Sequence, residues 1–382
     1  MDVDDGKVLL RFEREALLGI GAIWRSGWQP TEVARQVLRT TSPPIGRLAL
    51  VAIAADHTNR STATLDPRWI TQLDALDLPR VEASTGWLAA WAEREQMPWS
   101  ELVETAVALL KSLASLSGLP ILIPPPGTRA DPDTRIDLTA RTNDPMLNRV
   151  RALLALAEST TFDAEAEAFT AKAQELMTRH AIDSALVSAG RDRSERPLTI
   201  RVALDDPYVA AKSQLLHHVA KHSRCVSVHL RRYAMSSVTG FAGDVAASEL
   251  LFTSLLVQAQ TAMHTAAATA PAGAPARSRP FRSAFLFAYA HRIGERLAEI
   301  NAGVIKRAEA ETSRSILPVL AARSSVVDAT VAEMFGELSR SRARRGYDAA
   351  GWASGRGAAD RARLNSGGLP APARVPARQL GA

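Results

Sequence analysis

A run of three prolines near residue 125 restricts the fold of this chain more than any other feature. Pro124, Pro125 and Pro126 are followed by Gly127 and then by polar residues up to Asn143. Proline fixes φ and lacks a backbone N–H group, so a helix cannot continue through the run and the segment is extended. We therefore predict that residues 124–143 form a linker that follows a separate N-terminal domain.

The N-terminal domain, residues 1–123, reads as a helical bundle. Aromatic residues make up only 5% of the chain, while Ala, Leu and Arg are abundant, which favours helix over sheet. Leu9, Phe12, Ala16 and Ile20 recur at the spacing of one helical face. Prolines at positions 30, 43, 44, 67 and 98 separate the apolar stretches and indicate where helices begin or end.

Residues 144–190 have the most regular helical pattern and are predicted to form a helical pair. The first apolar stripe contains Leu147, Val150, Leu153, Leu154 and Ala157, and the second contains Ala166, Phe169, Ala173, Leu176, Met177 and His180. Acidic residues precede basic ones along the second stripe, which suits the helix dipole. The acidic cluster therefore has a structural explanation.

Residues 196–364 change character and are predicted to form a small α+β domain. Short β-branched segments at 198–202, 225–230 and 237–241 read as strands, while 207–222 and 244–267 read as helices. A long helix follows residue 280, and residues 316–320 with 326–327 are predicted to add a strand and a turn. The tail, 365–382, is predicted to be disordered. The expected fold class is mostly α with a smaller α+β domain.

The sequences MLNRVRALLALAEST at 146–160 and EAEAFTAKAQELM at 165–177 resemble a known family. The family is that of the domain of unknown function 2786, found in uncharacterised proteins of actinobacteria and their phages. A looser similarity continues to about residue 364. The resemblance implies an actinobacterial type of protein with a helical pair and a companion α+β domain, and it implies no established activity or catalytic residues.

Charge is spread unevenly along the chain. Residues 1–145 carry 15 Lys/Arg against 19 Asp/Glu, and residues 146–276 carry 13 against 12. Residues 277–382 carry 18 against 9, so the C-terminal third is strongly basic. This asymmetry indicates either an anionic partner or a solvated, arginine-rich surface.

A basic cluster near residue 342 is the leading candidate for a binding site. The candidate nucleic-acid-binding residues are Arg340, Arg342, Arg344, Arg345, Tyr347 and Arg356. Guanidinium groups match phosphate oxygens, and an aromatic ring such as that of Tyr347 or Trp352 can stack on bases. We therefore expect a non-enzymatic protein associated with DNA or RNA. The alternative is that these arginines bind no ligand and are solvated cations at the end of a helix.

A protein–protein adaptor is the second hypothesis. Tryptophan is enriched at the residues that dominate binding interfaces. The N-terminal helices could present five tryptophans to another protein: Trp24, Trp28, Trp87, Trp91 and Trp99. Core packing of the same side chains is the alternative.

A metal-dependent hydrolase at the patch between His217 and His229 is the third hypothesis. His218 and His222 lie four residues apart, so on a helix they share a face and could bind one metal ion. However, the general-base Glu usual in such zinc motifs is missing, and Lys221 would repel a cation. Cys225 is the only cysteine and reads as a small buried residue of a strand rather than as a nucleophile.

No motif predicts a cofactor. The glycines at 351, 355 and 357 lack the Lys-Ser/Thr ending of a phosphate loop, and their small neighbours favour close helix packing. The N-terminus lacks the pattern of a secretory signal, and the longest apolar runs, such as 48–55, are far too short to span a membrane. A single cysteine excludes an intrachain disulfide and fits a reducing compartment, so we expect a cytoplasmic protein without membrane contact.

Overall fold

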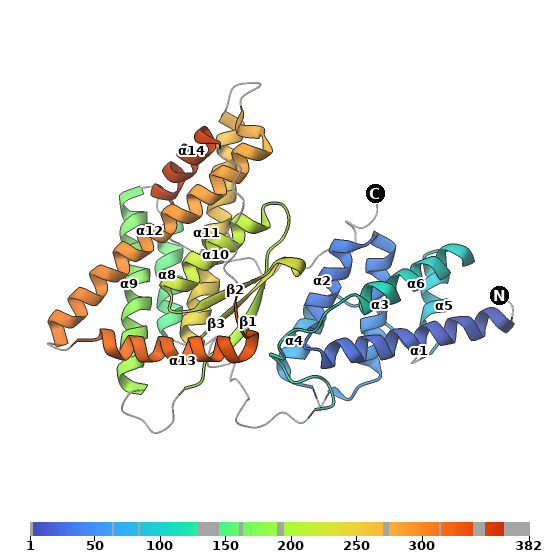
Figure 1. The fold of residues 1–382 in the computed structure, drawn as a ribbon. Coiled ribbons are helices and arrows are strands. Elements are labelled where there is room, and N and C mark those ends of the chain that lie inside the picture. Colours follow the sequence, from blue (N-terminus) through green and yellow to red (C-terminus); the bar gives the residue numbers. More distant parts are fainter. Residues whose placement is uncertain are drawn as a thin grey trace. The chain divides into compact units, whose positions relative to one another are not determined.

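The chain divides into two compact units, Met1–Ile136 and Asp137–Leu369. The computed structural model describes residues 3–62, 65–82, 85–128, 145–159, 163–188, 195–269, 275–312, 315–338 and 348–362. The fold is mostly α with a smaller α+β part, as the composition predicted (Figure 1). Most of the predicted linker and the predicted disordered tail lie outside the described residues.

Prolines mark the starts of helices in the first unit. Its helices are α1 (Val3–Arg25), α2 (Pro30–Thr40), α3 (Pro43–Thr58), α4 (Pro67–Ala75), α5 (Trp87–Arg94) and α6 (Trp99–Ala114). Helices α2, α3 and α4 each begin at a proline, where the missing N–H would have no intrahelical partner. Pro98 is the N-cap of α6. The expected helical bundle is confirmed.

Tryptophans form much of the first unit's core and hold the segment that follows α6. The indole of Trp28 donates to the Ser117 carbonyl at 2.9 Å, and that of Trp69 donates to the Pro124 carbonyl at 2.8 Å. The ring of Trp24 packs edge-on against Trp69, with centroids 5.1 Å apart. The first proline of the predicted linker is therefore fastened to the helical unit.

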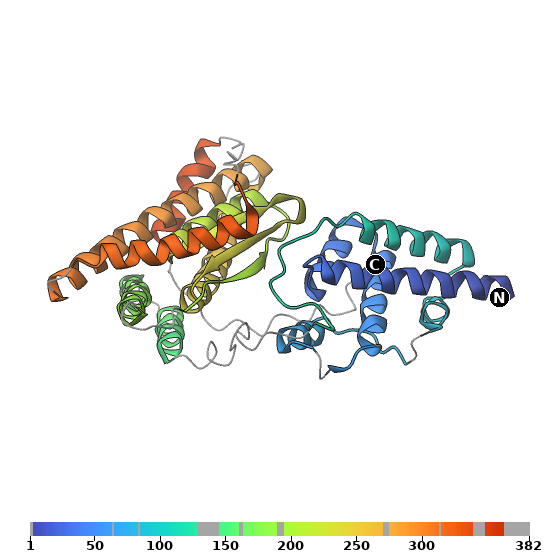
Figure 2. The ribbon, with the colours of Figure 1, turned by 60° about the horizontal axis from the view of Figure 1, so that its bottom comes forward.

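The second unit begins with the predicted helical pair. Helices α8 (Pro145–Ser159) and α9 (Asp163–Ser188) pack against each other, and Figure 2 looks nearly along both. The predicted strands are also present, as β1 (Leu198–Ala203), β2 (Val226–Leu230) and β3 (Met235–Gly240). Helices α10 (Val209–His222) and α11 (Ala242–Thr269) complete the α+β part.

The three strands form an antiparallel sheet in the order β1-β3-β2. All six residues of the central strand β3 are buried, including Ser236, Ser237 and Thr239. Helices α10 and α11 contact the sheet, as does the later helix α13 (Leu317–Phe335). The Thr239 hydroxyl lies 2.8 Å from that of Thr199 on β1, so this buried hydroxyl is paired within the sheet.

The strand and turn predicted at 316–320 and 326–327 are wrong, because these residues belong to helix α13 and its N-cap. Val, Leu and Ile suit a strand by propensity, but their spacing decides the outcome here. Leu320, Val327 and Val331 are buried at intervals of seven and four residues, which is one face of a helix. Pro318 lies in the first turn, where a helix tolerates proline.

Helix α12 (Arg279–Thr312) is the long helix predicted after residue 280, and α14 (Ala349–Asp360) is the last described helix. In Figure 1 the left-hand end of α13 lies close to the lower parts of α9 and α12. They share an apolar cluster of Ile182, Ala185, Val304, Ala308, Ile316 and Leu320. This cluster joins the helical pair to the rest of the unit.

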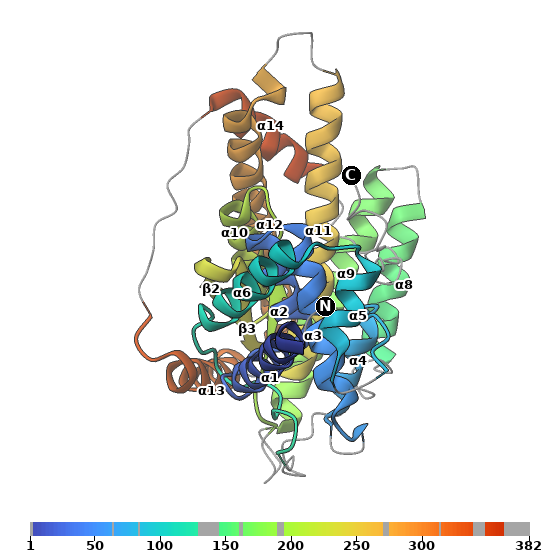
Figure 3. The ribbon, with the colours of Figure 1, turned by 90° about the vertical axis from the view of Figure 1, so that its right-hand side faces the viewer.

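Helix α14 lies directly against the start of α12 (Figure 3). Gly351 and Gly355 allow this approach, because a Cβ at either position would overlap the carbonyl group of Phe281 or Phe285 respectively. The glycines four residues apart therefore form one flat face of α14. The predicted packing role of these small residues is confirmed.

We predict that Gly355→Ala destabilises the protein, because the new Cβ would collide with the rigid Phe285 carbonyl. The expected loss in the free energy of unfolding is about 1–3 kcal/mol, the usual cost of overpacking. Urea unfolding of the full chain measures it. Gly357→Ala is the matched control: its Cβ would meet only the flexible end of Arg361, and alanine favours helix by roughly 0.5–1 kcal/mol. Equal stabilities of the two variants would contradict the close packing.

Candidate functional site

Most of the predicted basic cluster lies outside the described residues. Arg340, Arg342, Arg344, Arg345 and Tyr347 fall within 339–347, which joins α13 to α14 in sequence. The sequence from 338 to 347 contains these four arginines and no acidic residue. Their role therefore stays a prediction.

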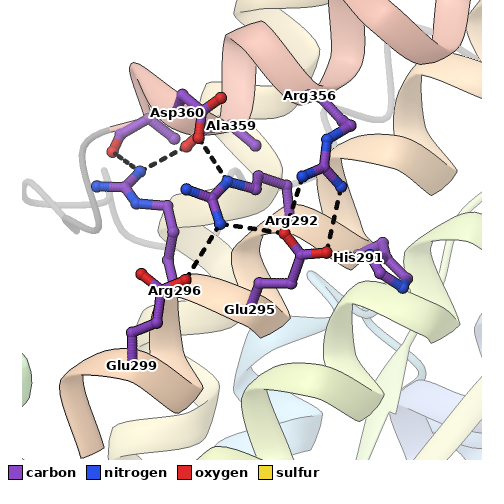
Figure 4. A network of polar contacts seen from close by, with 9 residues as sticks. His291, Arg292, Glu295, Arg296, Glu299, Arg356, Ala359 and Asp360 are labelled. Atoms are coloured by element: carbon purple, nitrogen blue, oxygen red, sulfur yellow. Dashed lines mark hydrogen bonds and ion pairs between the residues drawn. The ribbon is translucent and has the colours of Figure 1, made fainter.

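Arg356 is the one predicted binding residue that the structure describes, and it lies on α14. Its guanidinium donates to both carboxylate oxygens of Glu295 on α12, at 3.2 and 3.0 Å (Figure 4). Glu295 also accepts from Arg292 at 3.0 Å and faces the ring of His291 at 3.0 Å. The hydrogen bond from Arg356 is the main cause of the lowered pKa of Glu295.

Two further arginines of α12 hold the end of α14. Arg292 donates to the Asp360 carboxylate, and Arg296 donates to the carbonyl groups of Ala359 and Ala362, the latter at 3.0 Å (Figure 4). Ala359 lies in the last turn of α14 and Ala362 just beyond its end, so the buried Arg296 fastens this terminus to α12. Part of the positive charge of the C-terminal third is thus structural.

Four aromatic rings form a continuous strip across α10, α12 and α14. The centroid distances are 5.8 Å for His217 to His218, 6.0 Å for His218 to His291 and 6.3 Å for His291 to Trp352. His217 and His291 are exposed, and Trp352 is half-buried. We call these four residues the aromatic strip. The positive charge of Lys221 acts on its His217 and His218 end.

The histidines of the predicted patch have different neighbours, although His217, His218 and His222 are close enough for their charges to interact. His218 belongs to the aromatic strip, where burial and the neighbouring cationic groups lower its pKa to about 4. His222 lines a separate pocket, described below, and His229 bonds the Met235 carbonyl within the sheet at 3.2 Å. Within the described ranges no group of three or more His, Cys, Asp or Glu side chains could hold a metal ion.

Cys225 is buried directly before β2 and is not arranged as a nucleophile. Burial raises the pKa of its thiol to about 12, so the reactive thiolate is scarce at neutral pH. The Ser248 hydroxyl donates to its sulfur at 3.5 Å, and the side chain fills the space next to Gly240.

A pocket with a mixed apolar and polar lining lies where the helical pair meets α10 and α11. It is a shallow, open pocket, and its roughly 290 Å³ of empty space includes solvent at the mouth. It is lined by Met146, Met177, Thr178, His180, His222, Ser223, Arg224, Gly243, Asp244 and Ala247. We call this the Asp244 pocket.

Asn301 of α12 connects two walls of this pocket. It accepts a hydrogen bond from the Thr178 hydroxyl of α9 at 2.9 Å and donates to the His222 carbonyl of α10 at 2.6 Å. One side chain therefore fixes the distance between the helical pair and the end of α10.

Asp244 is the acidic residue that lines the pocket, and its pKa is shifted. Its side chain is buried in the first turn of α11, and its Oδ2 atom has no hydrogen-bond partner. Burial raises its pKa to about 6, although Arg224 and Arg323 favour the charged form. The nearest ion-pair contact, to the Arg323 guanidinium, is 4.0 Å long.

Arg224 faces the same pocket from the turn after α10. Its backbone has φ of +58°, the left-handed region that non-glycine residues rarely adopt. The half-buried guanidinium makes no hydrogen bond or ion pair with another described residue, and burial lowers its pKa. Sequence analysis missed both Asp244 and Arg224, because Asp244 reads as an ordinary helix-start acid and Arg224 as a strand flank.

Comparison with known proteins confirms the predicted resemblance over a short segment. Residues 146–184 match the family model described as protein of unknown function (DUF2786). The matched residues are most of α8 and α9, and they contribute Met146, Met177, Thr178 and His180 to the Asp244 pocket. No curated protein and no solved structure matches the chain. No helix in the described part of the chain has the length and apolar character needed to cross a bilayer.

We predict that Asp244→Asn changes the pH dependence of stability. The folded pKa of about 6 lies above the ordinary value of 3.8, so the folded protein binds more protons than the unfolded chain between these values. Wild-type stability therefore falls as pH rises from about 4 to about 6. The Asn side chain does not titrate, so the variant lacks this pH dependence. The unfolding free energy of Asp244→Asn minus that of wild type should therefore increase by roughly 2–3 kcal/mol from pH 4 to pH 7.

Urea unfolding at several pH values measures this difference. Asp328→Asn, at an exposed position of α13, is the matched control for loss of a surface carboxylate. A difference between Asp244→Asn and wild type that does not vary with pH would show that Asp244 is not held in an unfavourable buried environment.

Proposed function

We propose that this is a non-enzymatic, cytoplasmic protein that binds single-stranded DNA or RNA through its basic C-terminal region. The observation that carries the proposal is the aromatic strip of His217, His218, His291 and Trp352. The arginine cluster at 340–345 directly precedes the helix that carries Trp352. Rings and arginines together are what an unpaired strand requires.

The two components would act on different parts of the strand. Arginines and lysines neutralise phosphates and release counterions, which gives affinity without regard to sequence. Exposed rings accept bases by stacking, and every base has a face that can stack. A duplex hides its base faces, so the strip favours an unpaired strand.

The charge beside the strip is mixed. Glu295 contacts His291 and is paired with both Arg292 and Arg356, while Arg292 also pairs with Glu299 and Asp360. Lys221 is exposed near the other end of the strip. The three cations offset the three carboxylates, so the main attraction for a phosphate backbone would come from the arginine cluster at 340–345.

The adaptor alternative draws little support from the tryptophans that suggested it. Trp24, Trp28, Trp87 and Trp91 are buried in the first unit, while Trp99 is 39% exposed. Buried indoles stabilise the helical bundle and are not available to a partner. Trp99 is the only one of these five that presents an open surface.

We predict that the full chain binds labelled oligothymidine with an affinity that falls linearly in log salt, as measured by fluorescence anisotropy. Each arginine of the 340–345 cluster changed to Ala should reduce the steepness of the log–log plot by about 0.7 if it contacts a phosphate. Trp352→Ala should weaken binding about fivefold or more, because stacking contributes about 1–3 kcal/mol per base.

An abasic strand of equal length separates stacking from phosphate contact. Trp352→Ala should leave binding of that strand unchanged, and Trp99→Ala should leave binding of both strands unchanged. Thermal melting shows that each variant is folded. Absence of binding at about 50 mM salt, where electrostatic attraction is strong, would end the proposal.

A further inference from the structure

Two groups of opposite charge line the Asp244 pocket without satisfying each other. Asp244 is 8% exposed, and its Oδ2 atom accepts no hydrogen bond. Arg224 lines the same pocket, and its guanidinium donates to no other described residue. Buried charged groups are normally paired or hydrogen-bonded, so this arrangement calls for a third group between them.

The remaining walls of the pocket suit an anion. Gly243 and Asp244 belong to the first turn of α11, a helix of 28 residues whose N-terminal amides carry partial positive charge. His180 and His222 add ring nitrogens, and Gly243 lies beside the His180 ring. The Oδ2 atom of Asp244 in the same wall lies 4.0 Å from the Arg323 guanidinium but accepts no hydrogen bond, so the ligand that fits best also donates a proton.

We infer that the Asp244 pocket binds inorganic phosphate in its hydrogen phosphate form. The unprotonated phosphate oxygens would accept hydrogen bonds from Arg224 and from the α11 amides. The P–OH group would donate its hydrogen bond to the Oδ2 atom of Asp244. One ligand would thereby hydrogen-bond both the Arg224 guanidinium and the Asp244 carboxylate, which form no hydrogen bond with each other.

Other ligand classes fit these residues less well. A metal ion would be repelled by Arg224 and by Arg323, which lies near Asp244. Sulfate has the size and charge of hydrogen phosphate but no proton at neutral pH, so it would place an acceptor oxygen against the carboxylate oxygen. The missing hydrogen bond to a charged group costs about tenfold or more in affinity.

The inference uses different residues from the proposed nucleic-acid surface and does not depend on it. Isothermal titration of the full chain with phosphate and with sulfate, at pH 7.5 and matched ionic strength, tests it. Wild type is expected to bind phosphate at least about tenfold more tightly than sulfate. Asp244→Asn is expected to bind both anions comparably, because the amide can donate to either.

Arg224→Gln is expected to lose most phosphate binding, since it removes the charged donor. Asp328→Asn and Arg231→Gln change exposed residues outside the pocket and should keep the wild-type preference. Wild-type binding of phosphate and sulfate with equal affinity, phosphate binding that survives Arg224→Gln, or no phosphate binding by folded wild type would each overturn the inference. In the last case the pocket holds water only.

Discussion

The second unit depends on the surface of α12. Gly351 and Gly355 bring the backbone of α14 against the carbonyl groups of Phe281 and Phe285, a contact that no larger residue permits. Farther along the same helix, Gly294 leaves room for the ring of His218 on α10. One helix thus fixes the positions of α10 and α14, and with them both ends of the aromatic strip.

The same helix links the family segment to the Asp244 pocket. Asn301 bonds Thr178 on α9 and the His222 carbonyl on α10, so the helical pair is held at the pocket wall by a polar contact. The family match covers 146–184 alone, yet its side chains meet Arg224 and Asp244 in one pocket. The helical pair and the α+β part therefore build this site together.

Local sequence signals predicted most of the fold. Prolines gave the starts of α2, α3 and α4, and β-branched runs gave the three strands. The strand and turn predicted within α13 were wrong, because packing of one helical face overrides the strand propensity of its valines. The site was less predictable, because Asp244 and Arg224 come together only where segments distant in sequence meet. The histidines four residues apart on α10 likewise differ in their contacts: His218 lies against His291, and His222 lines the Asp244 pocket.

Native-state hydrogen exchange of the full chain, resolved by mass spectrometry, tests most directly whether α12 organises the second unit. Regions that unfold together exchange with a common opening free energy. We predict that the slowest amides of α9, α12 and α14 share one opening free energy and lose protection together as denaturant is raised. Exchange of α14 or α9 at the rate of an unfolded peptide, while α12 stays protected, would contradict this dependence.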